Sequence, residues 1–146
     1  MGFRFSLATV LRLRENLEHT ESLVLERHYA ELARVQGMLW EAELNIGNAR
    51  RIKNEELAQG MTGIQLQLAI EEESRLQQHR DTLLQKLQEA QKLLREQMAT
   101  YRKARQKRDV LEELRKRNFN SYRREQEKRE QRERDEAFLL RRKNRN

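Results

Sequence analysis

Residues 25–49 read LERHYAELARVQGMLWEAELNIGNA, and this stretch decides the fold. From Leu25 to Ala49 the apolar residues recur in steps of 3, 4, 3, 4, 3, 4 and 3 when His28 is counted among them. This alternation is the repeat of about 3.5 residues by which one α-helix packs along another in a coiled coil. It therefore predicts a long coiled-coil helix and excludes disorder in this part of the chain.

The composition indicates a helical protein with a small core. The 146 residues are 38% charged and 36% hydrophobic, and they include no proline and no cysteine. An ordinary globular domain is about 25% charged and about 45–50% apolar, so we expect no core of normal size. A chain without cysteine forms no disulfide and no thiolate metal site, and no apolar run reaches the ~18–20 residues that cross a bilayer. We therefore expect a soluble cytoplasmic protein.

A turn at about residues 59–63 separates two helices. Gly60 can adopt the left-handed conformation that ends a helix, and Thr62 with Gln65 matches the Thr-x-x-Gln capping box that begins the next one. The run Glu71–Glu73 is interpreted as a solvated face. We predict a single coiled-coil domain over residues 1–146, with helices at about 7–58 and about 64–136 and a tail to 146. The predicted fold class is all-α, a long antiparallel two-helix coiled-coil hairpin with an overhanging basic C-terminal helix.

The second helix repeats the apolar spacing, and a short turn makes the two helices antiparallel neighbours. With the tip near residue 61, facing residues have numbers that total about 122, which places Phe3 and Phe5 near Phe119. Arg80 and Arg108 interrupt the repeat. The expected seam residues of the second helix are Leu66, Ala69 or Ile70, Leu76, Leu83, Leu87, Ala90, Leu94, Met98, Tyr101, Leu111, Leu114, Phe119 and Tyr122.

The basic excess lies in the C-terminal third. Residues 102–146 contain 18 Lys and Arg against 9 Asp and Glu, whereas residues 1–101 contain 13 against 15. Beyond Tyr122 there is no apolar stripe, only opposite charges three or four places apart, worth about 0.2–0.5 kcal/mol per pair. The excess points to an anionic partner surface. Nonspecific nucleic-acid binding is the alternative use, although no base-stacking or groove-reading motif supports it.

No motif predicts an enzyme. The spacing of His19, His28 and His79 does not suit a metal site, and no glycine-rich phosphate loop is present. A two-helix hairpin also has no pocket in which to desolvate a pair of carboxylates. We therefore expect no catalytic residue, no metal and no cofactor.

Three residues of the first helix have two interpretations each. Gly37 and Gly47 each cost about 1 kcal/mol relative to alanine inside a helix. They mark either a flexible zone or positions at which the second helix packs closely. Trp40 lies at the edge of the seam and is either a contact anchor for a partner or a partly buried flank residue.

Both ends of the chain carry a recognisable pattern. Residues 3–14 read FRFSLATVLRLR, and residues 122–137 read YRREQEKREQRERDEA. They resemble the Phe-x-Phe-x-Leu opening and the Tyr…Asp-Glu-x-Ala tail of the flagellar export protein FliJ family. Arg132 stands where lysine is common and Arg134 where an aliphatic residue is usual, while Gly60 and Thr62 match the family's turn.

The resemblance implies a soluble coiled-coil component of the bacterial flagellar type III protein export apparatus. Such a rod couples the export ATPase hexamer to the cytoplasmic domain of the export gate and escorts export chaperones. It is cytoplasmic and only peripheral at the inner membrane, with no nucleic acid as a partner. A structural coiled coil of another secretion assembly is a further alternative.

The resemblance also assigns two partner-binding regions. The residues expected at the ATPase ring are Phe3, Phe5, Leu7, Phe119, Tyr122, Arg123, Arg124, Arg129, Arg132 and Asp135. The residues expected to face the gate, nearer the hairpin tip, are Trp40, Ile46, Ile70 and Leu76.

Overall fold

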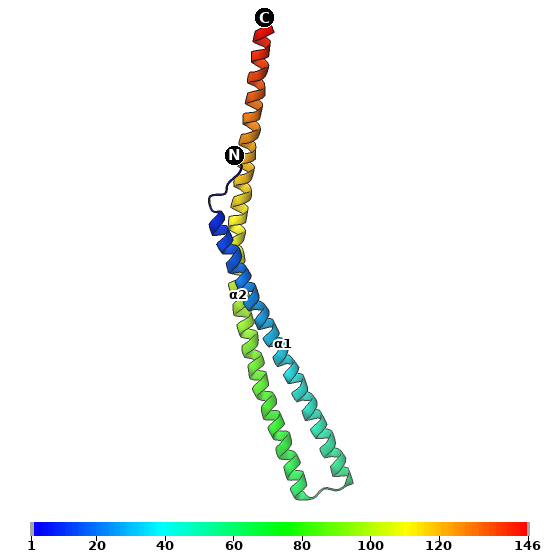
Figure 1. Cartoon of the computed structure of the whole chain (residues 1–146). Helices are drawn as coiled ribbons and strands as arrows, with labels where there is room; N and C mark the ends of the chain where they lie inside the picture. Colours follow the sequence, from blue (N-terminus) through cyan, green and yellow to red (C-terminus); the bar gives the residue numbers. More distant parts are fainter. Residues whose placement is uncertain (1, 146) are drawn as a thin grey trace. The chain divides into compact units, whose positions relative to one another are not determined.

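The computed structural model describes residues 2–145 as two long α-helices, with no strand among them. Helix α1 spans Ala8–Gln59 and helix α2 spans Gly63–Arg145 (Figure 1). The helices pack against each other in antiparallel fashion, so the predicted all-α hairpin is confirmed. Helix α2 continues nine residues past the predicted end near residue 136, because neither glycine nor proline follows that point to stop it.

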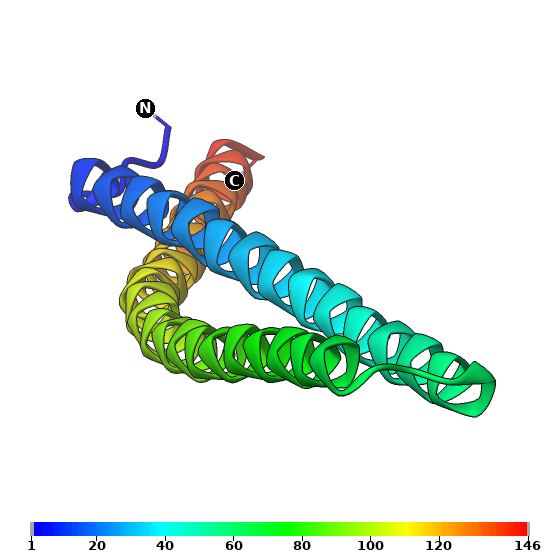
Figure 2. The ribbon, with the colours of Figure 1, turned by 90° about the horizontal axis from the view of Figure 1, so that it is seen from below.

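The turn between the helices forms as its sequence predicts. Gly60 has a φ of 106°, the left-handed conformation that other residues rarely adopt. The amide of Gln65 donates to Thr62 Oγ1 over 3.2 Å, and the amide of Thr62 donates to Gln65 Oε1 over 3.1 Å. These two bonds complete the capping box at the start of α2. Figure 2 views the hairpin from below.

The chain divides into two compact units, and each is described by itself. One comprises residues 21–101, here called the tip unit, and the other comprises residues 2–20 with 102–145, here called the open-end unit. Each unit contains a segment of both helices. The division falls where the charge of the sequence also changes, at residue 102.

The core of the tip unit is a narrow apolar seam. Leu83 and Val35 are 0% and 1% exposed, and no other side chains of their size are as well buried in the part of the chain that the structure describes. The remaining buried members are Ala42, Ile46, Ala90 and Leu94. Of the two alternatives at the start of α2, Ala69 lies in the seam, whereas Ile70 is 50% exposed.

Charged residues take several places in the same seam. The solvated-face interpretation is wrong for Glu73, which accepts a hydrogen bond from Arg50 Nε over 2.5 Å and one from Lys53 Nζ over 2.7 Å. These bonds lower the pKa of Glu73, and the bond from Lys53 contributes most. Arg80 is half-buried at its expected interruption of the repeat. Glu73 lies one heptad after Leu66, so it occupies a position of the helix–helix interface. There it meets its two partners on α1.

The two helical glycines are not explained by close packing against α2. A Cβ atom built on Gly37 or on Gly47 would meet no side chain or other helix within 4 Å. The interpretation that α2 packs closely at these positions is therefore wrong.

The core of the open-end unit is smaller. Phe5 and Leu11 are its two buried apolar residues, at 9% and 4% exposed. Arg108 lies in the seam and pairs through its Nε with Glu18, which raises the pKa of the arginine. Glu18 and Arg108 have numbers that total 126, close to the predicted register of about 122.

Candidate partner-binding surfaces

An aromatic cluster gathers in the open-end unit. The segment before α1 places the ring of Phe3 edge-on against Phe119, with centroids 5.4 Å apart and planes at 74°. The same ring lies 5.6 Å from that of Tyr122. Edge-to-face pairs of this kind are worth about 0.5–1.5 kcal/mol beyond the area that they bury. The expected gathering of Phe3 with Phe119 is thus present, and Tyr122 joins it.

Local backbone hydrogen bonds join the N-terminal segment to the first turn of α1. The amide of Ala8 donates to the carbonyl of Phe5 over 3.1 Å, and that of Leu11 donates to the carbonyl of Leu7 over 2.9 Å. The side chain of Phe5 is buried, whereas Leu7 is 37% exposed. The alternation Phe-x-Phe-x-Leu therefore divides its apolar residues between the helix interface and the surface.

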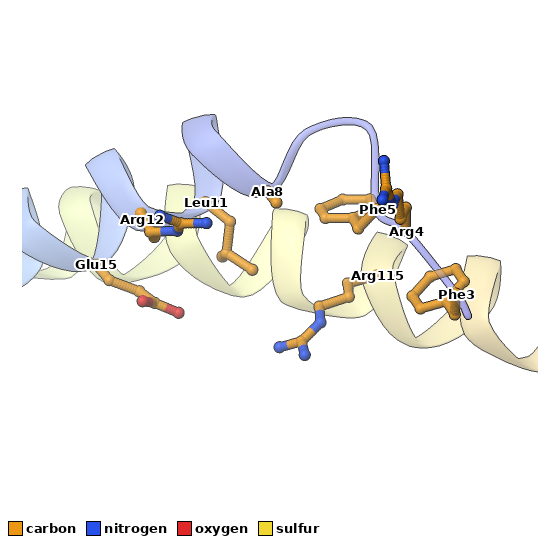
Figure 3. A pocket seen from close by; sticks show the side chains of 8 residues that line it. All are labelled: Phe3, Arg4, Phe5, Ala8, Leu11, Arg12, Glu15 and Arg115. Atoms are coloured by element: carbon orange, nitrogen blue, oxygen red, sulfur yellow. The ribbon is translucent and has the colours of Figure 1, made fainter. Parts of the chain in front are cut away.

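Two shallow grooves flank Phe3, and both have basic side chains in their walls. One is lined by Phe3, Arg4, Phe5, Ala8, Leu11, Arg12, Glu15 and Arg115 (Figure 3). The other is lined by Phe3, Glu112, Arg115, Lys116 and Phe119. Figure 3 shows Phe5 and Leu11 pointing toward α2 and Arg115 on α2 itself.

Sequence reasoning missed the contribution of Arg4 and Arg12 to this surface. The signal was their position next to the aromatic and apolar residues of the opening pattern, which places cations at the rim of any surface that those residues form. An apolar floor with a basic rim suits an acidic protein surface that also presents apolar side chains.

Helix α2 continues beyond its aromatic contacts as a largely solvated basic segment, residues 123–145, here called the basic extension. Apart from Gln126, every side chain of this segment is exposed. Arg123 pairs with Glu127 over 3.4 Å and Lys128 with Glu125 over 3.9 Å, as the i,i+3 and i,i+4 pattern predicts. Arg124, Arg129 and Arg132 have no ion pair among the described residues, so their charges are available to a partner. Asp135 accepts a hydrogen bond from Gln131 over 3.1 Å.

The four residues expected near the gate do not share one surface. Trp40 is 67% exposed and Ile70 is 50% exposed. Ile46 is 3% exposed in the seam, and Leu76 is half-buried there, so both support the surface from within. The interpretation of Trp40 as a partly buried flank residue is wrong, and its exposed indole fits a contact anchor.

Among the described residues, 2–145, two kinds of feature are in question, a metal site and a membrane-spanning helix. Within residues 2–145 no group of three or more His, Asp and Glu side chains is placed to hold a metal ion. In that same range, no helix is long and apolar enough to cross a bilayer.

The family model described as flagellar FliJ protein matches residues 3–146, which is essentially the whole chain. The chain belongs to the flagellar FliJ protein family. No curated protein and no solved structure matches it. Membership in the FliJ family makes this a coiled-coil protein associated with the flagellar export apparatus, from a family of non-enzymatic export components.

Proposed function

We propose that this FliJ-family chain couples the export ATPase ring to the cytoplasmic domain of the export gate and also escorts export chaperones. It would do so in the cytoplasm, peripherally at the inner membrane. Two surfaces contribute, one in each unit. No proline interrupts either helix, so a displacement applied to one part of a helix is not absorbed by a proline kink.

The observation that carries the proposal is the basic extension of the open-end unit. Its side chains are exposed except for that of Gln126, and Arg124, Arg129 and Arg132 are among its arginines that have no carboxylate partner within the described residues. A solvated helix with free cations gains little stability from them, so a partner is the simplest use for their charge. We assign it to the ATPase ring, with the cluster of Phe3, Phe119 and Tyr122 as the apolar part of the same contact.

The gate-facing surface rests on exposure in the tip unit. Trp40 and Ile70 present apolar area to solvent at 67% and 50% exposure. Ile46 and Leu76 pack in the seam between the two helices and therefore take part indirectly. A large aromatic with most of its surface free is the kind of residue that dominates binding energy at interfaces.

Charge reversal tests the ring contact. The triple variant Arg124→Glu, Arg129→Glu and Arg132→Glu should weaken binding to the export ATPase hexamer by at least ~10-fold at physiological salt. The matched control reverses three exposed cations of the tip unit, Lys86, Lys92 and Arg95, and should bind as the wild type does. Thermal midpoints should be similar in both variants. Equal binding by both variants would remove the basic extension as the contact, and a wild-type chain that binds neither ATPase nor gate domain would overturn the proposal.

A further inference from the structure

Helix α1 carries a second apolar stripe on the side away from α2. Its members recur in steps of 3, 4, 3, 4 and 3, and all are exposed: Ala30, Ala33, Gly37, Trp40, Leu44 and Gly47. This spacing is again that of a helix-packing seam. The outer face of a two-helix coiled coil is ordinarily charged, so the stripe has no role in the hairpin itself.

Helix α2 shows what the outer face is otherwise like. From residue 67 to residue 99 the equivalent outer positions of α2 are polar except for one alanine, and they follow a single apolar residue, Ile64, at the start of the helix: Gln67, Glu71, Ser74, Gln78, Asp81, Gln85, Gln88, Lys92, Arg95 and Ala99. The apolar outer stripe is therefore a property of α1 alone.

The glycines of the stripe lack an explanation within the chain. Gly37 and Gly47 lower helix stability relative to alanine, and no other part of the described chain comes near the position of a Cβ on either. Between them, Trp40 is 67% exposed and Leu44 is 47% exposed. Two large side chains are thus flanked on each side by a position that has no side chain at all, as in a surface that accepts the large side chains of another helix.

We propose that a second copy of this chain binds to this stripe, with the two α1 helices antiparallel about a two-fold axis. Trp40 then covers Gly37 of the partner subunit, Leu44 covers Ala33 of the partner subunit, and Gly47 meets Ala30 of the partner subunit. Each large residue faces a small one, and the same contacts occur twice, as a two-fold interface requires. The paired stretch, residues 26–51, is about 39 Å long at 1.5 Å per residue.

The charges beside the stripe complement one another in the same register. On the flank Arg34 lies opposite Glu41 of the partner subunit, and at the two ends of the stripe Arg51 lies opposite Glu26 of the partner subunit. Within its own chain Arg34 also pairs with Glu31, with its Nη2 donating over 2.6 Å and its Nε over 3.0 Å, so its guanidinium would be shared between Glu31 and Glu41 of the partner subunit. No like charges face each other along the flanks, because Gln36 faces Glu43 of the partner subunit and Arg27 faces Asn48 of the partner subunit. This complementarity selects a second copy as the occupant.

Disulfide trapping tests the register directly, because the chain has no native cysteine. The double variant Ala33→Cys with Leu44→Cys should form covalent dimers under mild oxidation. Each single variant should not, because like positions lie about 16 Å apart along the axis, whereas a disulfide needs Cα atoms within about 7 Å. A mixture of the two single variants should form the mixed dimer.

The matched control for trapping has the same spacing on the outer face of α2, Ser74→Cys with Gln85→Cys, and should form no covalent dimer. Covalent dimers of either α1 single variant would indicate a different register and overturn the proposal. Trapping of the control as efficiently as the test pair would also overturn it, since collisions would then explain the crosslinks.

Sedimentation of the cysteine-free chain measures the same contact at equilibrium. Trp40→Ala should weaken dimerisation by roughly 30-fold, which corresponds to a loss of about 2 kcal/mol. Gly37→Gln should abolish the dimer yet raise the thermal midpoint of the monomer, because glutamine is the better helix former. Ala99→Gln, at the equivalent outer position of α2, should leave the dimer unchanged.

The inference goes beyond the proposed function. Trp40 is also the main residue of the proposed gate-facing surface, so a dimer and a gate contact through this residue exclude each other. The experiments use the chain alone, and their outcome does not depend on the ATPase or the gate. A wild-type chain that remains monomeric up to about 1 mM, a very weak association, overturns the proposal and leaves a helix of another protein as the occupant of the stripe.

Discussion

The tip unit and the open-end unit use the same two helices in different ways. In the tip unit both helices contribute to one buried seam, with Leu83 at 0% and Val35 at 1% exposed. In the open-end unit two buried residues, Phe5 and Leu11, and an aromatic cluster hold the N-terminal segment, while α2 continues with no partner on α1. Apolar periodicity is present where the helices are paired and absent where α2 is alone. The stability provided by the paired helices and the exposed positive charge of α2 thus lie in different stretches of one continuous helix.

The largest effect should come from emptying the seam of the tip unit. Leu83→Ala should lower the free energy of unfolding by about 2–5 kcal/mol, because it removes a completely buried side chain and leaves a cavity. Its neighbour Leu84 is 39% exposed, and Leu84→Ala should cost less than about 1 kcal/mol. Urea denaturation followed by circular dichroism compares the two. Equal losses would mean that the seam is not where the stability of this unit resides.

A smaller and local effect is expected in the open-end unit. Phe3→Ala removes two aromatic contacts and should cost about 1–2 kcal/mol of local stability, which releases the N-terminal segment without unfolding α2. Hydrogen exchange at the amides of Ala8 and Leu11 reports this opening. Leu7→Ala is the control, since Leu7 is 37% exposed. Indistinguishable exchange in the two variants would show that the aromatic cluster does not hold the segment.

The contacts of Glu73 with Lys53 and Arg50 in the seam of the tip unit should respond to pH. Lys53 and Arg50 lower the pKa of Glu73, so the folded state favours the carboxylate more than the unfolded state does. The stabilisation is therefore present at neutral pH and is lost as the pH falls through the lowered pKa. Glu73→Gln should lower the thermal midpoint at pH 7, and the difference from wild type should shrink below about pH 4.

The control for that titration is Glu72→Gln. Glu72 pairs with Arg75 on the same helix, and both side chains are well exposed, so the change should be small at every pH. A midpoint difference for Glu73→Gln that stays constant from pH 7 to pH 3 would contradict a stabilising interaction of the Glu73 carboxylate with Lys53 and Arg50.

The smallest effect on stability should come from removing most of the basic extension. Truncation after Glu127 deletes only exposed side chains among the described residues, so the rest of the chain should lose less than about 0.5 kcal/mol. Circular dichroism should fall in proportion to the helical residues removed. A large drop in the midpoint of the remaining chain would show that the extension stabilises the hairpin, and the contrast between the two units would fail.

Features set by neighbouring residues in the chain could be predicted from sequence. The spacing from Leu25 to Ala49, the left-handed Gly60 and the capping box of Thr62 and Gln65 each depend on residues within one or two turns. The C-terminal end of α2 could not, because the last residues have no apolar stripe and no helix-stopping residue. In the tip unit Glu73 was assigned to the wrong face because the repeat was traced through apolar residues alone.

The candidate site was predictable only where periodicity separates inner from outer positions. The heptad steps already place Ile46 in the seam, and the exposed Trp40 one step off it, so the two residues do not have equal access to a partner. The reason for Gly37 and Gly47 could not be found from spacing, because it depends on what lies beside them in space. Their empty surroundings became informative only with the coordinates.

The turn of three residues, Gly60 to Thr62, also orders the events of folding. Contacts near it join residues only about twenty positions apart, such as Lys53 and Glu73, whereas the ring of Phe3 must find Phe119 across 116 positions. The entropy lost on closing a loop grows with its length, so pairing should start at the turn and extend from there toward the ends of the chain. The Phe-x-Phe segment is then the last part to close and the first to come undone. A partner that binds this segment would therefore meet a part of the chain that opens without unfolding the rest of the hairpin.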